Sequence, residues 1–121
     1  MQNIVKTLSQ HLKLMPDVVF GYLFGSYANG DYQERSDVDV ALFLQKSDLD
    51  TQLQINYELS KFLGKDVDLV VLNNVKNLYL LDAIFNEGKV IKDDRKRLEF
   101  EVKKQHEILD FKVLKKMIDA A

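Results

Sequence analysis

The sequence of 121 residues has no cysteine, no tryptophan and a single proline. The lack of cysteine excludes disulfides, zinc sites built from thiolates and catalysis by a thiol. No apolar run approaches the roughly 20 residues that a helix needs to span a membrane. The N-terminal segment MQNIVKTLSQHLKLMPD is interrupted by polar side chains, unlike a signal peptide. We therefore expect a cytoplasmic protein that does not enter a membrane.

Neither sign of charge dominates, because 17 basic and 19 acidic side chains leave a net charge of −2. The distribution is uneven: residues 1–91 carry 8 basic and 12 acidic side chains, whereas residues 92–121 carry 9 and 7. A chain of this charge has no general basic field for nucleic acid, and no basic, aromatic-lined groove is indicated. We expect no direct nucleic-acid binding, and a polymerase is the least favoured activity.

Apolar residues make up 46% of the chain, which is enough for one core and one domain over residues 1–121. The apolar pattern predicts helices and strands in alternation. The expected helices are 3–14, from 47 or 48 to 63, 75–86 and 94–117, and the expected strands are 18–24, 37–44, 66–72 and 90–91. This alternation indicates an α/β or α+β fold, without fixing the order of the strands.

Two pairs of acidic residues interrupt segments that otherwise have the composition of buried strands. Asp37 and Asp39 lie in one segment, and Asp66 and Asp68 have the same spacing in the next. Because strand side chains alternate between faces, the members of each pair point the same way. Like charges so close together repel one another and are costly to bury, and a divalent cation offsets that cost. If the two strands are neighbours, three or four carboxylates converge, a ligand set that suits Mg²⁺.

Gly25 and Ser26 directly follow the first strand and predict the other half of a phosphate site. Glycine lets a phosphate approach the backbone, a turn into a short helix exposes N–H groups, and serine adds a hydroxyl donor. A Gly-Ser turn alone is common, and so is a lone Asp-x-Asp pair. Together, with a second acidic strand downstream, they favour phosphoryl or nucleotidyl transfer assisted by Mg²⁺.

The order of these motifs resembles the DNA polymerase β-like nucleotidyltransferase superfamily. The matching residues are Phe24-Gly25-Ser26, ten intervening residues, Asp37-Val38-Asp39 and then Val67-Asp68-Leu69. The stretch GSYANGDYQERSDVDVALFL is similar to the minimal nucleotidyltransferases (MNT proteins) of bacteria and archaea, and the resemblance covers residues 18–72. The length and order of the whole chain are similar to the antitoxin of HEPN/MNT toxin–antitoxin pairs.

This resemblance implies a nucleotidyltransferase fold, with a small mixed sheet, helices packed against it and a long C-terminal helix. Asp37 and Asp39 would bind metal ions. Asp68 would help to hold metal and is the candidate general base. Gly25 and Ser26 would hold the β- and γ-phosphates of ATP. The implied reaction is Mg²⁺-dependent transfer of AMP to a tyrosine of a HEPN toxin, within a heteromeric complex, which blocks the toxin's ribonuclease activity.

Asn29 departs from the family pattern, because many relatives have arginine at this place in Gly-Ser-x-x-Arg-Gly. Arg35 or a lysine is the alternative source of a phosphate-binding cation. The departure keeps open a non-catalytic antitoxin that neutralises its toxin by contact alone. The same site chemistry would also serve a transferase that modifies a small molecule such as an aminoglycoside.

Other polar and aromatic side chains are expected to be structural. We expect Tyr27 and Tyr32 to pack beside the glycine-rich turn, with stacking on a nucleobase as the alternative. His11 and His106 are expected on the surface, and Asp66 is expected as a solvated residue at the start of its strand.

The last helix has two apolar rows. We expect one row to pack against the core, and it consists of Leu98, Val102, Leu109, Val113 and Met117. We expect the other row to be the better candidate for a partner interface, and it consists of Phe111, Leu114 and Ile118.

Overall fold

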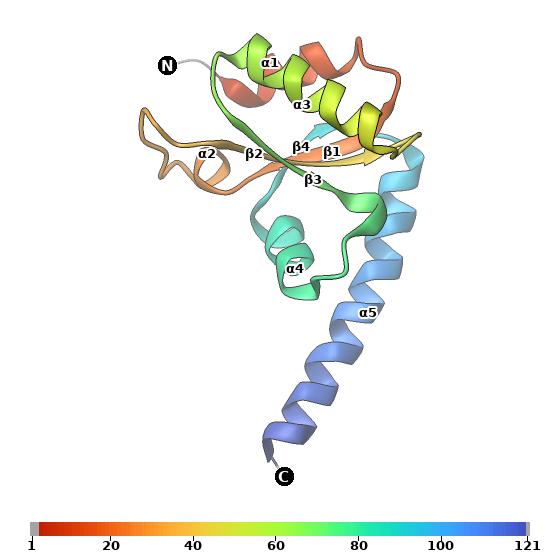
Figure 1. The fold of residues 1–121 in the computed structure, drawn as a ribbon. Coiled ribbons are helices and arrows are strands. Elements are labelled where there is room, and N and C mark those ends of the chain that lie inside the picture. Colours follow the sequence, from red (N-terminus) through yellow and green to blue (C-terminus); the bar gives the residue numbers. More distant parts are fainter. Residues whose placement is uncertain (1–2, 121) are drawn as a thin grey trace.

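A four-stranded mixed sheet is the centre of the structure, a computed structural model that describes residues 3–120. The strands are β1 (Val18–Phe24), β2 (Val38–Leu44), β3 (Val67–Val71) and β4 (Lys89–Lys92), and their spatial order is β3-β2-β1-β4 (Figure 1). β1 runs antiparallel to both β2 and β4, whereas β2 and β3 are parallel. The predicted α/β fold with a small mixed sheet is therefore confirmed.

Helices cover both faces of this sheet. The α-helices are α1 (Ile4–Leu12), α2 (Ser26–Asn29), α3 (Leu49–Leu63), α4 (Leu78–Glu87) and α5 (Arg95–Ala120), and a 3₁₀ helix, η1 (Leu72–Asn74), follows β3. α1 and α3 lie on one face of the sheet, and α4 and the long α5 lie on the other (Figure 1). None of the helices formed by residues 3–120 has the length and apolar character needed to cross a membrane.

The side chains of β2 alternate between two apolar cores. Val38, Val40 and Leu42 pack with α1 and α3, whereas Ala41 and Phe43 pack with α4 and α5. This alternation follows from the period of two in a strand. Any other side chain of β2 can therefore be assigned to a face by its parity.

Side-chain contacts set helix boundaries that differ from the apolar pattern by a few residues. α4 begins at Leu78 rather than at residue 75, since the Asn77 side chain accepts a hydrogen bond from the backbone N of Leu80 (3.1 Å) and caps the helix there. α1 ends at Leu12 rather than at residue 14, where the Lys92 ammonium donates to the carbonyl oxygen of Leu12 (2.9 Å). α5 runs on to Ala120, beyond the expected end at residue 117.

His11 is not a free surface residue, contrary to expectation. Its ring stacks on Phe62 of α3, with ring centroids 4.0 Å apart, and the side chain is half-buried. The reason is that α1 packs beside α3, which the pattern of α1 alone does not show. His106 on α5 is exposed, as expected.

The apolar rows of α5 are arranged differently from the prediction. Every residue of the row expected in the core is exposed, namely Leu98, Val102, Leu109, Val113 and Met117. The core-facing side instead contains Phe100 and Ile108, and Phe111 makes an edge-on contact with Tyr79 of α4 (5.2 Å between centroids). With 3.6 residues per turn, these three residues lie on the side of the helix opposite the exposed row.

A polar network ties the first half of α5 to the sheet. The hydroxyl of Tyr22, a buried residue of β1, donates a hydrogen bond to the Glu101 carboxylate. Arg97 donates to the same carboxylate oxygen, Oε1 (2.9 Å), and also pairs with Asp93 (2.6 Å). Burial raises the pKa of the Tyr22 hydroxyl, and the neighbouring Glu101 charge raises it further. The tyrosine therefore stays a neutral donor.

Replacing Tyr22 with phenylalanine should lower the free energy of unfolding by about 1–2 kcal/mol. The change removes a part-buried hydrogen bond to a charged acceptor while keeping the aromatic ring. Urea unfolding measures the loss. The matched control is Tyr79→Phe, which removes a hydrogen bond to Lys115 of α5 at an exposed site and should change stability by less than about 0.5 kcal/mol. Equal losses in the two variants would contradict the anchoring role of Tyr22.

Candidate active site

Asp39 and Asp68 stand side by side on neighbouring parallel strands. Their Cα positions are register partners between β2 and β3. Asp39 shares its face of the sheet with Ala41 and Phe43, and Asp68 shares the same face with Val70 of β3. The two acidic strands, whose order the sequence left open, are therefore neighbours, and both carboxylates face the side of the sheet that carries α4 and α5.

The Asp39 carboxylate is the electrostatically strained group of the site. It is half-buried, whereas Asp37 and Asp68 are exposed. Burial raises the pKa of Asp39, and the charges of Asp68 and Asp37, with a hydrogen bond to Asp68, raise it further. The fold thus holds at least two carboxylates close enough to repel one another.

Because Gly25 has no side chain, the Asp39 carboxylate can occupy the space beside its backbone. Phe24, the last residue of β1, is the register partner of Asp39, so the turn that begins at Gly25 lies against this carboxylate. A Cβ atom at Gly25 would lie 2.1 Å from the Oδ2 atom of Asp39. The backbone also has φ +70° and ψ −153° there, a conformation that L-residues almost never adopt. The site therefore needs glycine for two independent reasons.

The turn after Gly25 closes into the short helix α2. The backbone N–H groups of Ala28 and Asn29 both donate to the Gly25 carbonyl (3.1 and 3.2 Å). The side-chain oxygen of Asn29 accepts a hydrogen bond from the backbone N of Asp31 (3.0 Å), beyond Gly30 at φ +86°. Asn29 therefore completes the turn locally, at a position where the motif of many relatives has arginine.

Asp37 and Asp66 lie just outside the strands to which the pattern assigned them. β2 begins at Val38 and β3 begins at Val67. Asp37 opens onto a groove of about 640 Å³ that Arg35 and Lys61 also line. The main-chain carbonyl of Asp66 accepts a hydrogen bond from Val38 N (2.9 Å), while its side chain is exposed as expected. The backbone of Asp66 therefore aligns β2 with β3.

The comparison with known proteins agrees with this geometry. The family described as "Polymerase beta, Nucleotidyltransferase" matches residues 2–97. The chain belongs to this nucleotidyltransferase family. The matched range contains both halves of the predicted site, from Gly25 to Asp68.

Relatives of this nucleotidyltransferase include proteins named for adenylyl transfer. A Methanocaldococcus jannaschii protein, itself a candidate protein adenylyltransferase, is 31% identical over 90 residues, which are 69% of this chain and 90% of the relative. The protein adenylyltransferase MntA of Shewanella oneidensis is 33% identical over 89 residues, which are 72% of this chain and 60% of MntA.

Solved structures of toxin–antitoxin complexes contain chains with the same fold. One chain, from a toxin–antitoxin complex crystallised with AMP-PNP, aligns with a TM-score of 0.77 and 26% identity over 98% of this nucleotidyltransferase and 97% of that chain. A chain from the complex of the tri-AMPylated S. oneidensis HEPN toxin with its MNT antitoxin aligns with a TM-score of 0.71 and 24% identity, over 99% and 97%. These alignments run through α5 as well as the sheet, because they cover almost the whole chain.

The donor atoms of the site fit a metal ion that is shared with a nucleotide. Among residues 3–120, no three aspartate, glutamate or histidine side chains form a group that could hold a metal ion by themselves. Mg²⁺ usually takes only one or two carboxylates and completes its shell with water and phosphate oxygens. Asp39 and Asp68 supply such a pair, with Asp37 nearby. A cation would also remove the repulsion that raises the Asp39 pKa.

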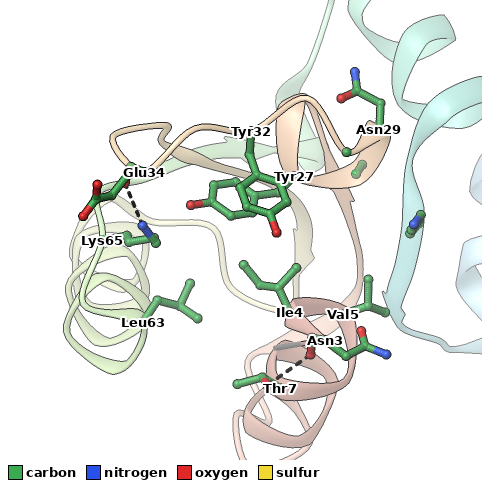
Figure 2. A pocket seen from close by; sticks show the side chains of 13 residues that line it. Asn3, Ile4, Val5, Thr7, Tyr27, Asn29, Tyr32, Glu34, Leu63 and Lys65 are labelled. Carbon is green, nitrogen blue, oxygen red and sulfur yellow. Dashed lines mark hydrogen bonds between the residues drawn. The ribbon is translucent and has the colours of Figure 1, made fainter. Parts of the chain in front are cut away.

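A separate cavity of about 480 Å³ lies on the opposite face of the sheet, between α1, α2 and the end of α3 (Figure 2). The rings of Tyr27 and Tyr32 stack on each other at its wall, with centroids 4.4 Å apart. Lys65 crosses the mouth to donate to the Glu34 carbonyl (2.9 Å). None of the three site aspartates lines it. The packing role expected for the two tyrosines is confirmed, and this cavity is distinct from the carboxylate site.

Two features of the site could not be predicted from the sequence. The contact of Gly25 with Asp39 joins residues that are far apart in the chain, and only the β1–β2 register reveals it. The groove beside Asp37 brings in Lys61 from α3, which no motif marks. Arg35, the alternative phosphate-binding cation expected from the sequence, lines this groove with Asp37.

Proposed function

We propose that this nucleotidyltransferase uses Mg²⁺ to transfer AMP from ATP to a tyrosine of a HEPN ribonuclease toxin, and that this transfer blocks the toxin. The observation that carries the proposal is the in-register pair of Asp39 and Asp68, with the Asp39 carboxylate seated against the backbone of Gly25. The S. oneidensis relative is a protein adenylyltransferase, and the toxin–antitoxin chain with 26% identity was crystallised with an ATP analogue. The S. oneidensis HEPN toxin carries AMP groups in its antitoxin complex.

In the proposed reaction, the tyrosine oxygen attacks the α-phosphorus of ATP. The bond from this phosphorus to the oxygen that bridges to the β-phosphate breaks, and pyrophosphate leaves. Asp68, which is exposed and so accessible to an acceptor, takes the phenolic proton as general base. Asp39, half-buried behind it, is placed to hold metal rather than to meet the acceptor. When bound, Mg²⁺ neutralises phosphate charge and activates the attacking hydroxyl.

Gly25 and Ser26 would bind the leaving pyrophosphate portion of ATP. The first N–H groups of a helix have no acceptor within it, and a phosphate oxygen can take them. Gly25, which lies against the Asp39 carboxylate, directly precedes α2 and Ser26. The groups that bind phosphate and the carboxylate that binds metal would thereby be adjacent.

A protein acceptor is favoured over a small molecule because a chain with the same fold and 26% identity was crystallised in a toxin–antitoxin complex with AMP-PNP. The partner would then contribute the surface that positions its own tyrosine. A small-molecule transferase would instead need its own acceptor pocket beside Asp39 and Asp68.

The test is intact-mass spectrometry of a HEPN protein purified after co-expression with this chain. A mass gain of AMP units is expected with the wild type. Asp68→Ala should lower the rate of gain about 10²- to 10⁴-fold, the usual loss on removing a general base. Asp66→Ala is the matched control, since that exposed side chain lies two residues away and only its carbonyl is used. It should leave the gain intact.

The same experiment separates the competing functions. A stable complex without any mass gain would indicate an antitoxin that acts by contact alone. The absence of both complex and mass gain would reject the HEPN partner and leave small hydroxyl acceptors as the next substrates to screen. Equal losses with Asp66→Ala and Asp68→Ala would contradict the role given to Asp68.

A further inference from the structure

The long helix α5 lies almost entirely outside the matched nucleotidyltransferase domain. The family match ends at residue 97, whereas α5 spans Arg95–Ala120. The chain from the toxin–antitoxin complex with AMP-PNP nevertheless aligns over 98% of this protein and 97% of its own length. The helix is therefore an addition to the catalytic domain that is shared with a chain found in a toxin complex.

One side of α5 packs on the core along its first half and makes polar contacts farther along. Its first half contacts the sheet through Phe100 and Ile108. Farther along, Lys112 pairs with Asp82 of α4 (2.9 Å), and Lys115 donates to the Tyr79 hydroxyl (2.7 Å). These contacts define the inner side of the helix and hold it in place.

The opposite side carries an exposed apolar row, here called the outer stripe. It consists of Leu98 (63% exposed), Val102 (54%), Leu109 (60%), Val113 (51%) and Met117 (66%). The stripe is about 28 Å long at 1.5 Å per residue. The row is interrupted only at the turn of Gln105 and His106, and five exposed apolar side chains along one helix side are more than the scattered apolar residues normal on a surface. Such a row indicates an interaction site.

The last turns of α5 extend beyond the rest of the molecule. Residues 112–120 are all exposed, and Figure 1 shows the end of the helix projecting past α4. A helical segment exposed on most of its circumference gains little from tertiary packing, which is the main source of helix stability in proteins. A binding partner that covers the outer stripe would supply the missing packing.

We propose that the outer stripe is the docking surface for the HEPN toxin, an inference that rests on the proposed function. The stripe is flanked by basic side chains (Arg95, Lys103 and Lys116) and by acidic ones (Glu99 and Asp110), and residues 92–121 carry 9 basic and 7 acidic side chains. It therefore fits a partner surface with an apolar groove and a polar rim of mixed charge. The toxin is favoured over a second copy of this chain because a chain that shares α5 was crystallised in a toxin–antitoxin complex. The helix that carries the stripe lies on the face of the sheet to which Asp39 and Asp68 point.

The test compares two double variants of α5. Val102→Glu/Leu109→Glu places charges in the outer stripe. The matched control, Leu114→Glu/Ile118→Glu, makes the same change at apolar residues with similar exposure (56% and 65%) outside the stripe. All four positions are exposed, so both proteins should fold, which circular dichroism and thermal melting check. We expect the stripe variant to raise the Kd for the toxin at least about 100-fold and the control less than about threefold.

Transfer kinetics separate docking from catalysis. The stripe variant should raise KM for the toxin while leaving kcat near that of the wild type, because the carboxylate site is unchanged. If the wild type transfers AMP and the stripe variant binds the toxin as tightly, the inference is wrong and the proposed function stands. Loss of binding in the control alone, or conversion of a wild-type dimer to a monomer with unchanged toxin affinity, would also overturn it. A wild type that neither binds nor modifies the toxin would remove the proposed function itself.

Discussion

Replacing Asp39 with asparagine should abolish AMP transfer and, at the same time, raise the free energy of unfolding. Asparagine has the same shape but cannot serve as an anionic metal ligand, so transfer should fall to background. The substitution also removes a half-buried charge that burial and the neighbouring Asp68 and Asp37 disfavour, as the raised pKa of Asp39 indicates. The new amide can donate to Asp68. We expect a gain of about 0.5–1 kcal/mol, a small value because water screens a site that is only partly buried.

Two measurements test whether Asp39→Asn raises the free energy of unfolding while it abolishes AMP transfer. Urea unfolding without divalent cation compares the wild type with Asp39→Asn. Added Mg²⁺ should then stabilise the wild type and leave the variant unchanged. Asp66→Asn is the control, since it removes one exposed carboxylate nearby and should alter neither stability nor transfer appreciably. A less stable Asp39→Asn variant that still transfers AMP would show that the carboxylates are not a functional cluster.

The face to which each aspartate points was predictable because it depends on strand parity. Alternation fixes which residues share a face, and two acidic strands joined by one helix are natural neighbours. The register between them was not predictable, since it is set by tertiary contacts such as the Val38–Asp66 backbone hydrogen bond. The motif therefore located the residues, and only the fold established that Asp39 lies opposite Asp68 rather than Asp66.

The side of α5 that faces the core could not be predicted from the apolar pattern. The helix has apolar residues on two sides, so amphipathicity alone does not identify its core-facing side. The choice is made by partners that are distant in sequence: Tyr22 holds Glu101, and Tyr79 contacts Phe111. The row expected in the core is exposed, whereas in the row expected at an interface only Phe111 packs, since Leu114 and Ile118 are exposed. A helix with apolar residues on two sides is better interpreted as one that packs on the core with one side and on a partner with the other.

Replacing Gly25 with alanine should damage both the fold and the site. The new Cβ would lie 2.1 Å from the Oδ2 atom of Asp39, and the backbone at φ +70° and ψ −153° is essentially closed to L-residues. Relaxation therefore has to move the turn, the carboxylate or both. We expect the free energy of unfolding to fall by about 2–4 kcal/mol, the sum of backbone strain and overpacking. AMP transfer by the fraction that stays folded should also drop sharply, because Asp39 is displaced.

Gly64→Ala provides the matched control for backbone strain alone. Gly64 also has a positive φ (+66°), at the end of α3, but a Cβ atom there would meet nothing within 4 Å. Its expected cost is about 1–2 kcal/mol, with normal transfer once the folded fraction is equalised. Urea unfolding and transfer rates at matched folded fractions compare the two variants. If Gly25→Ala were no more harmful than Gly64→Ala in either measurement, the contact between Gly25 and Asp39 would not be what shapes the site. If only Gly25→Ala lost transfer, the glycine would belong to the catalytic geometry itself.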